Sequence, residues 1–161
     1  MKNVDINKNA RLSEHFTLAE MCKTSAKTAD GNIPSHVHIE NLKRLCSWLE
    51  RLRQKYNLNI KEKIKNKNDE PIIINSGYRS PQVNKAVGGA QNSNHLTGCA
   101  ADIRCLGIEQ ALRYATTLLD ISDESKEDFD ELLIEKSSRS IWVHFAVRPK
   151  DNRRKVKFLK K

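Results

Sequence analysis

The stretch Phe129 to Val147, FDELLIEKSSRSIWVHFAV, decides the fold of this 161-residue chain. Two apolar runs, 129–136 and 141–147, flank a polar connection of hairpin length at 137–140. Runs of this kind joined by a short polar turn are typical of a β-hairpin. The residues therefore predict two antiparallel strands near the end of the sequence.

The second strand of this hairpin alternates with a period of two. One face is apolar and is expected to face the core: Ile141, Val143, Phe145 and Val147. The other face carries Trp142, His144 and Ala146. A histidine beside a tryptophan on that second face looks into a cleft or into solvent.

The turn also predicts which residues face each other across the hairpin. With a loop at 137–140, Glu135 lies opposite Trp142 and Leu133 lies opposite His144. Directly opposed residues share a face of the sheet. Glu135 is therefore expected on the same face as His144, and Glu131 is too, further from the turn. A register shift of one residue would move both to the opposite face.

Helices are predicted mainly before the hairpin. Ser35 can cap a helix running to about Tyr56, because its apolar residues recur at spacings of three and four. Shorter helices are expected at 16–22, 82–87 and 108–119, strands at 71–75 and 101–105, and an exposed loop at 57–70. This order favours a single α+β domain. We expect a polar arm at 1–12, the domain at 13–152 and a basic tail at 153–161.

The net charge of +9 gathers at 61–67 and 148–161. This positive charge suits either a solvated surface or attraction to a polyanion, but no nucleic-acid motif accompanies it, so a nucleic-acid partner is not expected.

No apolar run approaches the roughly 20 residues of a membrane span, and residues 1–10 show no signal peptide. None of the four cysteines forms a Cys-x-x-Cys pair, which favours free thiols in a reducing compartment.

Three separated residues suggest a metal site. His95 on a predicted loop and Asp102 opening a strand could converge on one ion, although each is also common as a surface or turn residue. His144 adds a third ligand on the exposed face of its strand. Two imidazoles and a carboxylate are a common ligand set for catalytic zinc, with a fourth position left for water. The alternative is that the three residues are unrelated.

The motifs around these residues resemble a known family. Ser76-Gly77-Tyr78-Arg79-Ser80, Ser93-x-His95-x-x-Gly98-x-Ala100-x-Asp102 and Trp142-Val143-His144 are similar to the zinc D-alanyl-D-alanine carboxypeptidases, in particular to their small phage- and mobile-element-type branch. The similarity runs from about Phe16 to Asn152. It implies the compact fold shared with Hedgehog signalling domains, with helices on a small, mostly antiparallel sheet. It also implies one Zn²⁺ per chain, held by His95, Asp102 and His144.

The resemblance further implies a substrate and the residues that bind it. The substrate would be a peptidoglycan stem peptide, cut by a monomer that is made in the cytoplasm and reaches the cell wall after release or export. Arg79 would hold a substrate carboxylate, which suits the two-pronged guanidinium, unless it only forms a salt bridge within its turn. Tyr78, Ser93 and Trp142 are further candidates for substrate binding, and Ser93 could instead order its loop.

The general base is where the sequence departs from the family pattern. Known members carry an acidic residue three positions before the last histidine ligand, and Ile141 stands there. Either the neighbouring strand supplies the base, or activity is lost and the chain is a cell-wall-binding module. The hairpin register favours Glu135 as the base, with Glu131 or Asp130 next. A basic nucleic-acid-binding protein is the remaining alternative.

Overall fold

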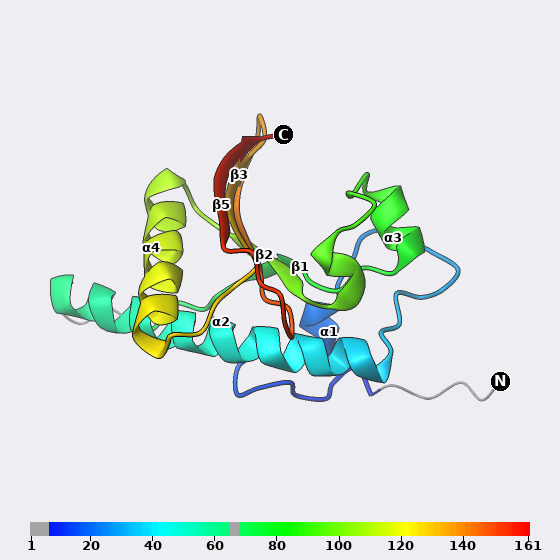
Figure 1. The fold of residues 1–161 in the computed structure, drawn as a ribbon, viewed down its shortest axis with the longest axis horizontal. Coiled ribbons are helices and arrows are strands. Elements are labelled where there is room, and N and C mark those ends of the chain that lie inside the picture. The colour runs from blue at the N-terminus through cyan, green and yellow to red at the C-terminus, as the bar shows by residue number, and fades with distance from the viewer. Residues whose placement is uncertain (1–6, 65–67) are drawn as a thin grey trace.

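A computed structural model describes residues 7–64 and 68–161. The elements follow in the order α1 (Leu18–Met21), α2 (His36–Lys63), β1 (Ile74–Ser76), α3 (Pro81–Ala86), the 3-10 helix η1 (Asn94–Thr97), β2 (Ala100–Arg104), α4 (Ile108–Ser125), β3 (Glu131–Lys136), β4 (Ile141–Ala146) and β5 (Lys155–Lys160). Figure 1 shows α4 on one side of the curved sheet, α3 on the other, and α2 running below both. None of the helices in the described ranges is long and apolar enough to cross a bilayer.

The five strands form one sheet in the order β1-β2-β4-β3-β5. Neighbouring strands are antiparallel except β3 and β5, which are parallel. Glu135 pairs with Trp142 and Leu133 with His144, so the hairpin register predicted from the sequence is confirmed. The predicted α+β class with a mostly antiparallel sheet is confirmed as well.

The core lies between the sheet and the two long helices. Val143 and Phe145 point from β4 into the cluster that contains the apolar stripe of α2. Of the residues predicted for that stripe, His38 is only partly buried, and the other five are completely buried: Leu42, Leu45, Cys46, Leu49 and Leu52. Because side chains alternate along a strand, His144 is left on the opposite face of the sheet.

Helix α2 extends further than expected. We predicted an exposed loop from residue 57, but the helix continues to Lys63. Tyr56 and Ile60 are both buried and prolong the apolar stripe at the same spacing of four. The Asn57 side chain donates to the carbonyls of Arg53 and Glu70, which holds the following segment against the helix.

Both ends of the domain are more structured than predicted. Part of the expected polar arm contacts α1, since Leu18 donates its backbone N–H to Ala10 and Ala19 donates to Lys8; residues 1–6 lie outside the described ranges. At the other end, the segment expected as a basic tail contains β5. Val156 and Phe158 alternate there with lysines, but the basic composition favoured a tail over a strand.

Candidate metal centre

Two of the three predicted ligands lie side by side on the face of the sheet opposite the core. Asp102 of β2 pairs directly with His144 of β4. His95 comes from η1, which Ser93 caps: the Ser93 hydroxyl accepts a hydrogen bond from the His95 backbone N–H. The structure therefore brings His95, Asp102 and His144 together, and both histidines are almost fully buried, at 2% and 6% exposure.

The distances between the donor atoms suit one metal ion. One ligand atom from each residue lies within 4.8 Å of the others. Asp102 Oδ1 is 3.3 Å from His95 Nε2 and 2.9 Å from His144 Nδ1. Ligands about 2.0–2.1 Å from a tetrahedral zinc lie about 3.3 Å apart. The residues present therefore fit a small divalent cation with nitrogen and oxygen ligands.

Hydrogen bonds on the far side of each ring fix which nitrogen faces the site. His95 Nδ1 donates to the Gly77 carbonyl at 2.6 Å, because a carbonyl can only accept. His144 Nε2 lies 3.0 Å from Glu131 Oε2 and donates to it. In neutral rings these bonds leave His95 Nε2 and His144 Nδ1 with free lone pairs. Such partners orient metal-binding histidines and raise their basicity.

The site is arranged to hold positive charge. Burial alone would raise the pKa of Asp102, but His95 and His144 outweigh it and hold the pKa well below its usual range. Burial would lower the pKa of His144, but hydrogen bonds to Asp102 and Glu131 raise it to about 9. A cation therefore belongs between these residues, whether it is a proton or a metal.

Glu131 has more partners than the sequence suggests. Its carboxylate accepts from His144, from Asn94 Nδ2 at 3.1 Å and from Arg153 Nη2 at 3.2 Å, and it pairs with Lys155 at 3.4 Å. The hydrogen bond from His144 is the largest influence lowering its pKa, to about 2. Glu131 is thus placed to orient His144.

Arg79 points at the metal ligands. Its Nη2 donates to Asp102 Oδ2 at 2.8 Å and its Nε donates to Ser76 Oγ at 2.8 Å. The Arg79 backbone also donates to the His95 carbonyl. The salt bridge considered from the sequence therefore exists, but its partner is Asp102. Two of the five guanidinium N–H groups are engaged, which leaves the two on Nη1 and one on Nη2 for a substrate carboxylate.

The other predicted residues lie in different settings. Glu135 is on the site face, as its register requires, and its Oε2 is 3.1 Å from Lys161 Nζ. Trp142 is half-buried on the same face. Tyr78 is only 4% exposed and packs its ring on His38, which leaves little of it for a substrate. Ile141 packs against the core, on the face away from His144.

Sequence reasoning missed two supports of the site. The Gly77 carbonyl, which accepts the hydrogen bond from His95, is a backbone group, so no side chain in the sequence indicates its role. A Cβ on Gly77 would lie 2.3 Å from the Met21 carbonyl oxygen, so this tight approach requires glycine. Asn94 donates to both Asp130 and Glu131, tying η1 to the start of β3. Its position directly before His95 was the only signal available.

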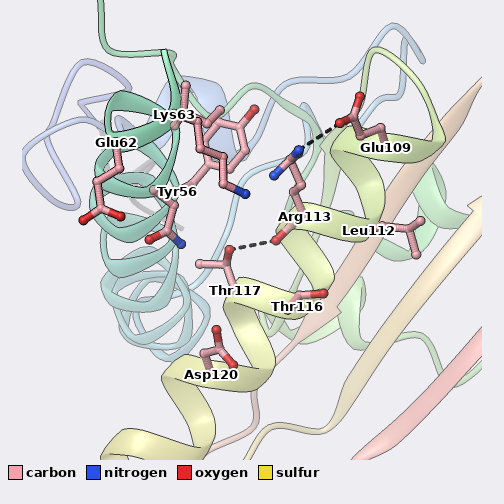
Figure 2. A pocket seen from close by; sticks show the side chains of 11 residues that line it. Tyr56, Glu62, Lys63, Glu109, Leu112, Arg113, Thr116, Thr117 and Asp120 are labelled. Carbon is pink, nitrogen blue, oxygen red and sulfur yellow. Dashed lines mark hydrogen bonds and ion pairs between the residues drawn. The ribbon is translucent and has the colours of Figure 1, made fainter. Parts of the chain in front are cut away.

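A separate hollow of about 410 Å³ lies between α2 and α4. Figure 2 shows Arg113 paired with Glu109 and Thr117 bonded to the Arg113 carbonyl there. Among the described residues, the only cluster of histidine, cysteine and carboxylate side chains able to hold a metal is the one on the sheet. The chemistry is therefore expected at the sheet rather than in this hollow.

Fold and site together define a class of protein. Among the described residues, three side chains able to bind a metal converge on this small α+β domain, and three protein ligands are typical of a catalytic zinc site, whereas a structural site has four. The family model described as Peptidase M15 matches residues 14–144, which include all three ligands. The chain belongs to the Peptidase M15 family, as the motif resemblance implied.

A curated relative points the same way over a short stretch. The zinc D-Ala-D-Ala carboxypeptidase of Streptomyces albus G is 54% identical to this chain over 35 residues. The match covers 22% of this chain and 14% of that protein. It supports a zinc peptidase and leaves the choice of peptide bond open.

Proposed function

We propose that this chain is a zinc-dependent peptidase that hydrolyses a peptide bond in peptidoglycan stem peptides. The observation that carries the proposal is the convergence of His95, Asp102 and His144 inside the part of the chain that the Peptidase M15 family matches. The relative from Streptomyces albus G, a zinc D-Ala-D-Ala carboxypeptidase, supports the substrate class.

In this proposal His95 Nε2, Asp102 Oδ1 and His144 Nδ1 hold one zinc ion. When bound, zinc supplies Lewis acidity, which lowers the pKa of water and polarises a carbonyl. The chain's own hydrogen bonds do the orienting. Gly77 fixes the His95 ring and Glu131 fixes the His144 ring, while Arg79 holds the second oxygen of Asp102.

Glu135 is the proposed general base. It shares the site face with His144 and is one diagonal step away across the hairpin. Its role would be to accept a proton from the attacking water and to pass it to the leaving amine. Glu131 and Asp130 are less suited, because hydrogen bonds and ion pairs keep the pKa of each at about 2. Arg79 is the proposed contact for the substrate's carboxylate end.

The test combines metal content with peptide cleavage. The purified protein should carry about one zinc per chain, and it should release amine from a stem peptide ending in D-Ala-D-Ala or from a cross-linked stem-peptide dimer. Comparing the two substrates separates a carboxypeptidase from an endopeptidase. Removing zinc with a chelator should abolish both reactions, and returning zinc should restore them.

His144→Ala should lose tight zinc binding and activity, because a three-ligand site would lose one of its protein bonds. His36→Ala is the matched control, since His36 is exposed at the start of α2, outside the ligand cluster. Full zinc occupancy in His144→Ala would overturn the ligand assignment. A zinc-loaded wild type that cuts neither substrate would overturn the proposed reaction.

A further inference from the structure

Strand β5 lies outside the residues that the family model matches, which end at 144. It nevertheless reaches the site face of the sheet. Across the strands, Asp102 pairs with His144, His144 with Leu133, and Leu133 with Lys157. Paired residues share a face, so Lys157 stands in one row with two metal ligands.

Two other lysines at this end of the chain are already matched with carboxylates on that face. Lys155 pairs with Glu131 at 3.4 Å, and Lys161 pairs with Glu135 at 3.1 Å. These contacts confirm that the odd-numbered side chains of β5 point to the site. They also mean that Lys155 and Lys161 each already have an acidic partner on β3.

Lys157 lies between these pairs and is exposed. Within residues 7–64 and 68–161, no ion pair or side-chain hydrogen bond joins Lys157 to another residue. It is therefore a positive charge on the site face that its described neighbours leave uncompensated. A free anion on a substrate would compensate it.

The distance suits a substrate that also reaches the metal. Strands in a sheet are about 4.8 Å apart, so the backbone of Lys157 lies roughly 10 Å from that of His144. An extended peptide advances about 3.3 Å per residue. Lys157 would thus meet a group about three residues from the bond being cut, with some freedom because its four-carbon stem is flexible.

We propose that Lys157 forms a subsite for a carboxylate of the substrate, and that the preferred peptide carries a free carboxylate about three residues from the scissile bond. The inference rests on the proposed peptidase function. It assigns a substrate preference to a strand that lies beyond the family match.

The experiment uses two synthetic stem pentapeptides that differ only in the carboxylate about three residues from the scissile bond. This carboxylate is free in the first peptide, the acidic one, and amidated in the second. Zinc-loaded wild type should cleave the acidic peptide with the higher kcat/KM. Lys157→Gln should lower kcat/KM for the acidic peptide roughly 2- to 5-fold, the size of an exposed ion pair, and leave the amidated peptide unchanged. Lys157→Glu should reverse the preference, and high salt should erase it in wild type.

Lys160→Gln is the matched control, because it removes the same charge from the opposite face of β5, where Lys160 pairs with Lys136. An equal effect of the two substitutions, or an unchanged peptide preference in Lys157→Gln, would overturn the subsite. Affinities for both peptides are measured in parallel by calorimetry. If wild type binds the acidic peptide more tightly but cuts neither peptide, the subsite stands and the proposed reaction fails. If wild type binds and cuts the two peptides equally, the subsite fails.

Discussion

At the scale of single residues, two glutamates on one face of β3 are set apart by their partners. Glu131 is held by His144, Asn94, Arg153 and Lys155. Among the described residues, the recorded ion pair of Glu135 is with Lys161 alone. The four partners of Glu131 suit a carboxylate that orients its neighbours, whereas the proposed base Glu135 has a single ion pair, with an exposed lysine, to give up.

Substituting each glutamate by glutamine separates these roles. Glu135→Gln should retain zinc and lower turnover by about 10²–10⁴-fold, the usual value of general acid–base catalysis. Glu131→Gln should instead weaken zinc binding by about 10–100-fold, as loss of a histidine's hydrogen-bond partner does. Zinc titration and single-turnover kinetics measure the two effects. Wild-type turnover in Glu135→Gln would remove Glu135 from the mechanism.

In the proposed site, Arg79 would link the metal ligand Asp102 to the substrate. Arg79→Lys keeps the charge but cannot contact Ser76 and Asp102 in the same fork-like way. We expect zinc affinity to fall by about 10–100-fold and KM to rise for peptides ending in a free carboxylate, even at saturating zinc. Arg104→Lys is the control, since Arg104 is exposed two residues beyond Asp102. If KM is unchanged, Arg79 acts only on Asp102.

The convergence of the three proposed ligands could be predicted from sequence, but their surroundings could not. The motif spacing of His95, Asp102 and His144 indicated convergence, and the hairpin register placed Glu135 correctly. The pairing of Arg79 with Asp102 depends on how β1 approaches β2. The bond from His95 depends on a backbone carbonyl. Neither leaves a pattern in a single sequence.

At the scale of elements, Asp130 joins three segments. It directly precedes β3, and its carboxylate accepts two hydrogen bonds from the guanidinium of Arg153, at 2.9 and 2.6 Å. It also accepts from Asn94 of η1 at 2.7 Å. Burial alone would raise the pKa of Asp130, but these donors outweigh it and lower the pKa to about 2. The carboxylate thus ties η1 and the entry to β5 to the start of β3.

This pKa predicts how stability depends on pH. The folded pKa lies below the ordinary value of 3.8, so the ionised group stabilises the fold above about pH 4, and that contribution disappears as the pH falls towards 2. It amounts to about 2 kcal/mol. The difference in free energy of unfolding between wild type and Asp130→Asn should therefore shrink over this window in denaturant titrations. A constant difference would show that the carboxylate's charge is unimportant.

The long amphipathic helix and the hairpin were predictable because their apolar periodicity is strong. The last turns of α2 were missed, since the lysines and asparagines around Ile60 dilute its stripe. Strand β5 was missed because its lysines favoured a basic tail, although Val156 and Phe158 alternate with them; both apolar side chains are still largely exposed.

At the scale of the whole molecule, the topology gathers distant parts of the chain. Gly77, His95, Asp102, Glu131 and His144 come from a turn, a 3-10 helix and three strands. The sheet order places β2 and β4 side by side in its interior, with neighbours on both flanks. Two of the three proposed metal ligands, Asp102 and His144, therefore stand on strands that are held on both sides, which suits a site whose donor atoms must stay in place.

The position of β5 also bears on how copies of this protein behave together. As the outermost strand of the sheet, it presents backbone groups that could pair with the same strand of another copy. Lys157 and Lys160, which have no recorded acidic partner among the described residues, leave that edge positively charged, and edge lysines are a common defence against such pairing. Mutual repulsion should keep concentrated solutions free of edge-to-edge aggregates.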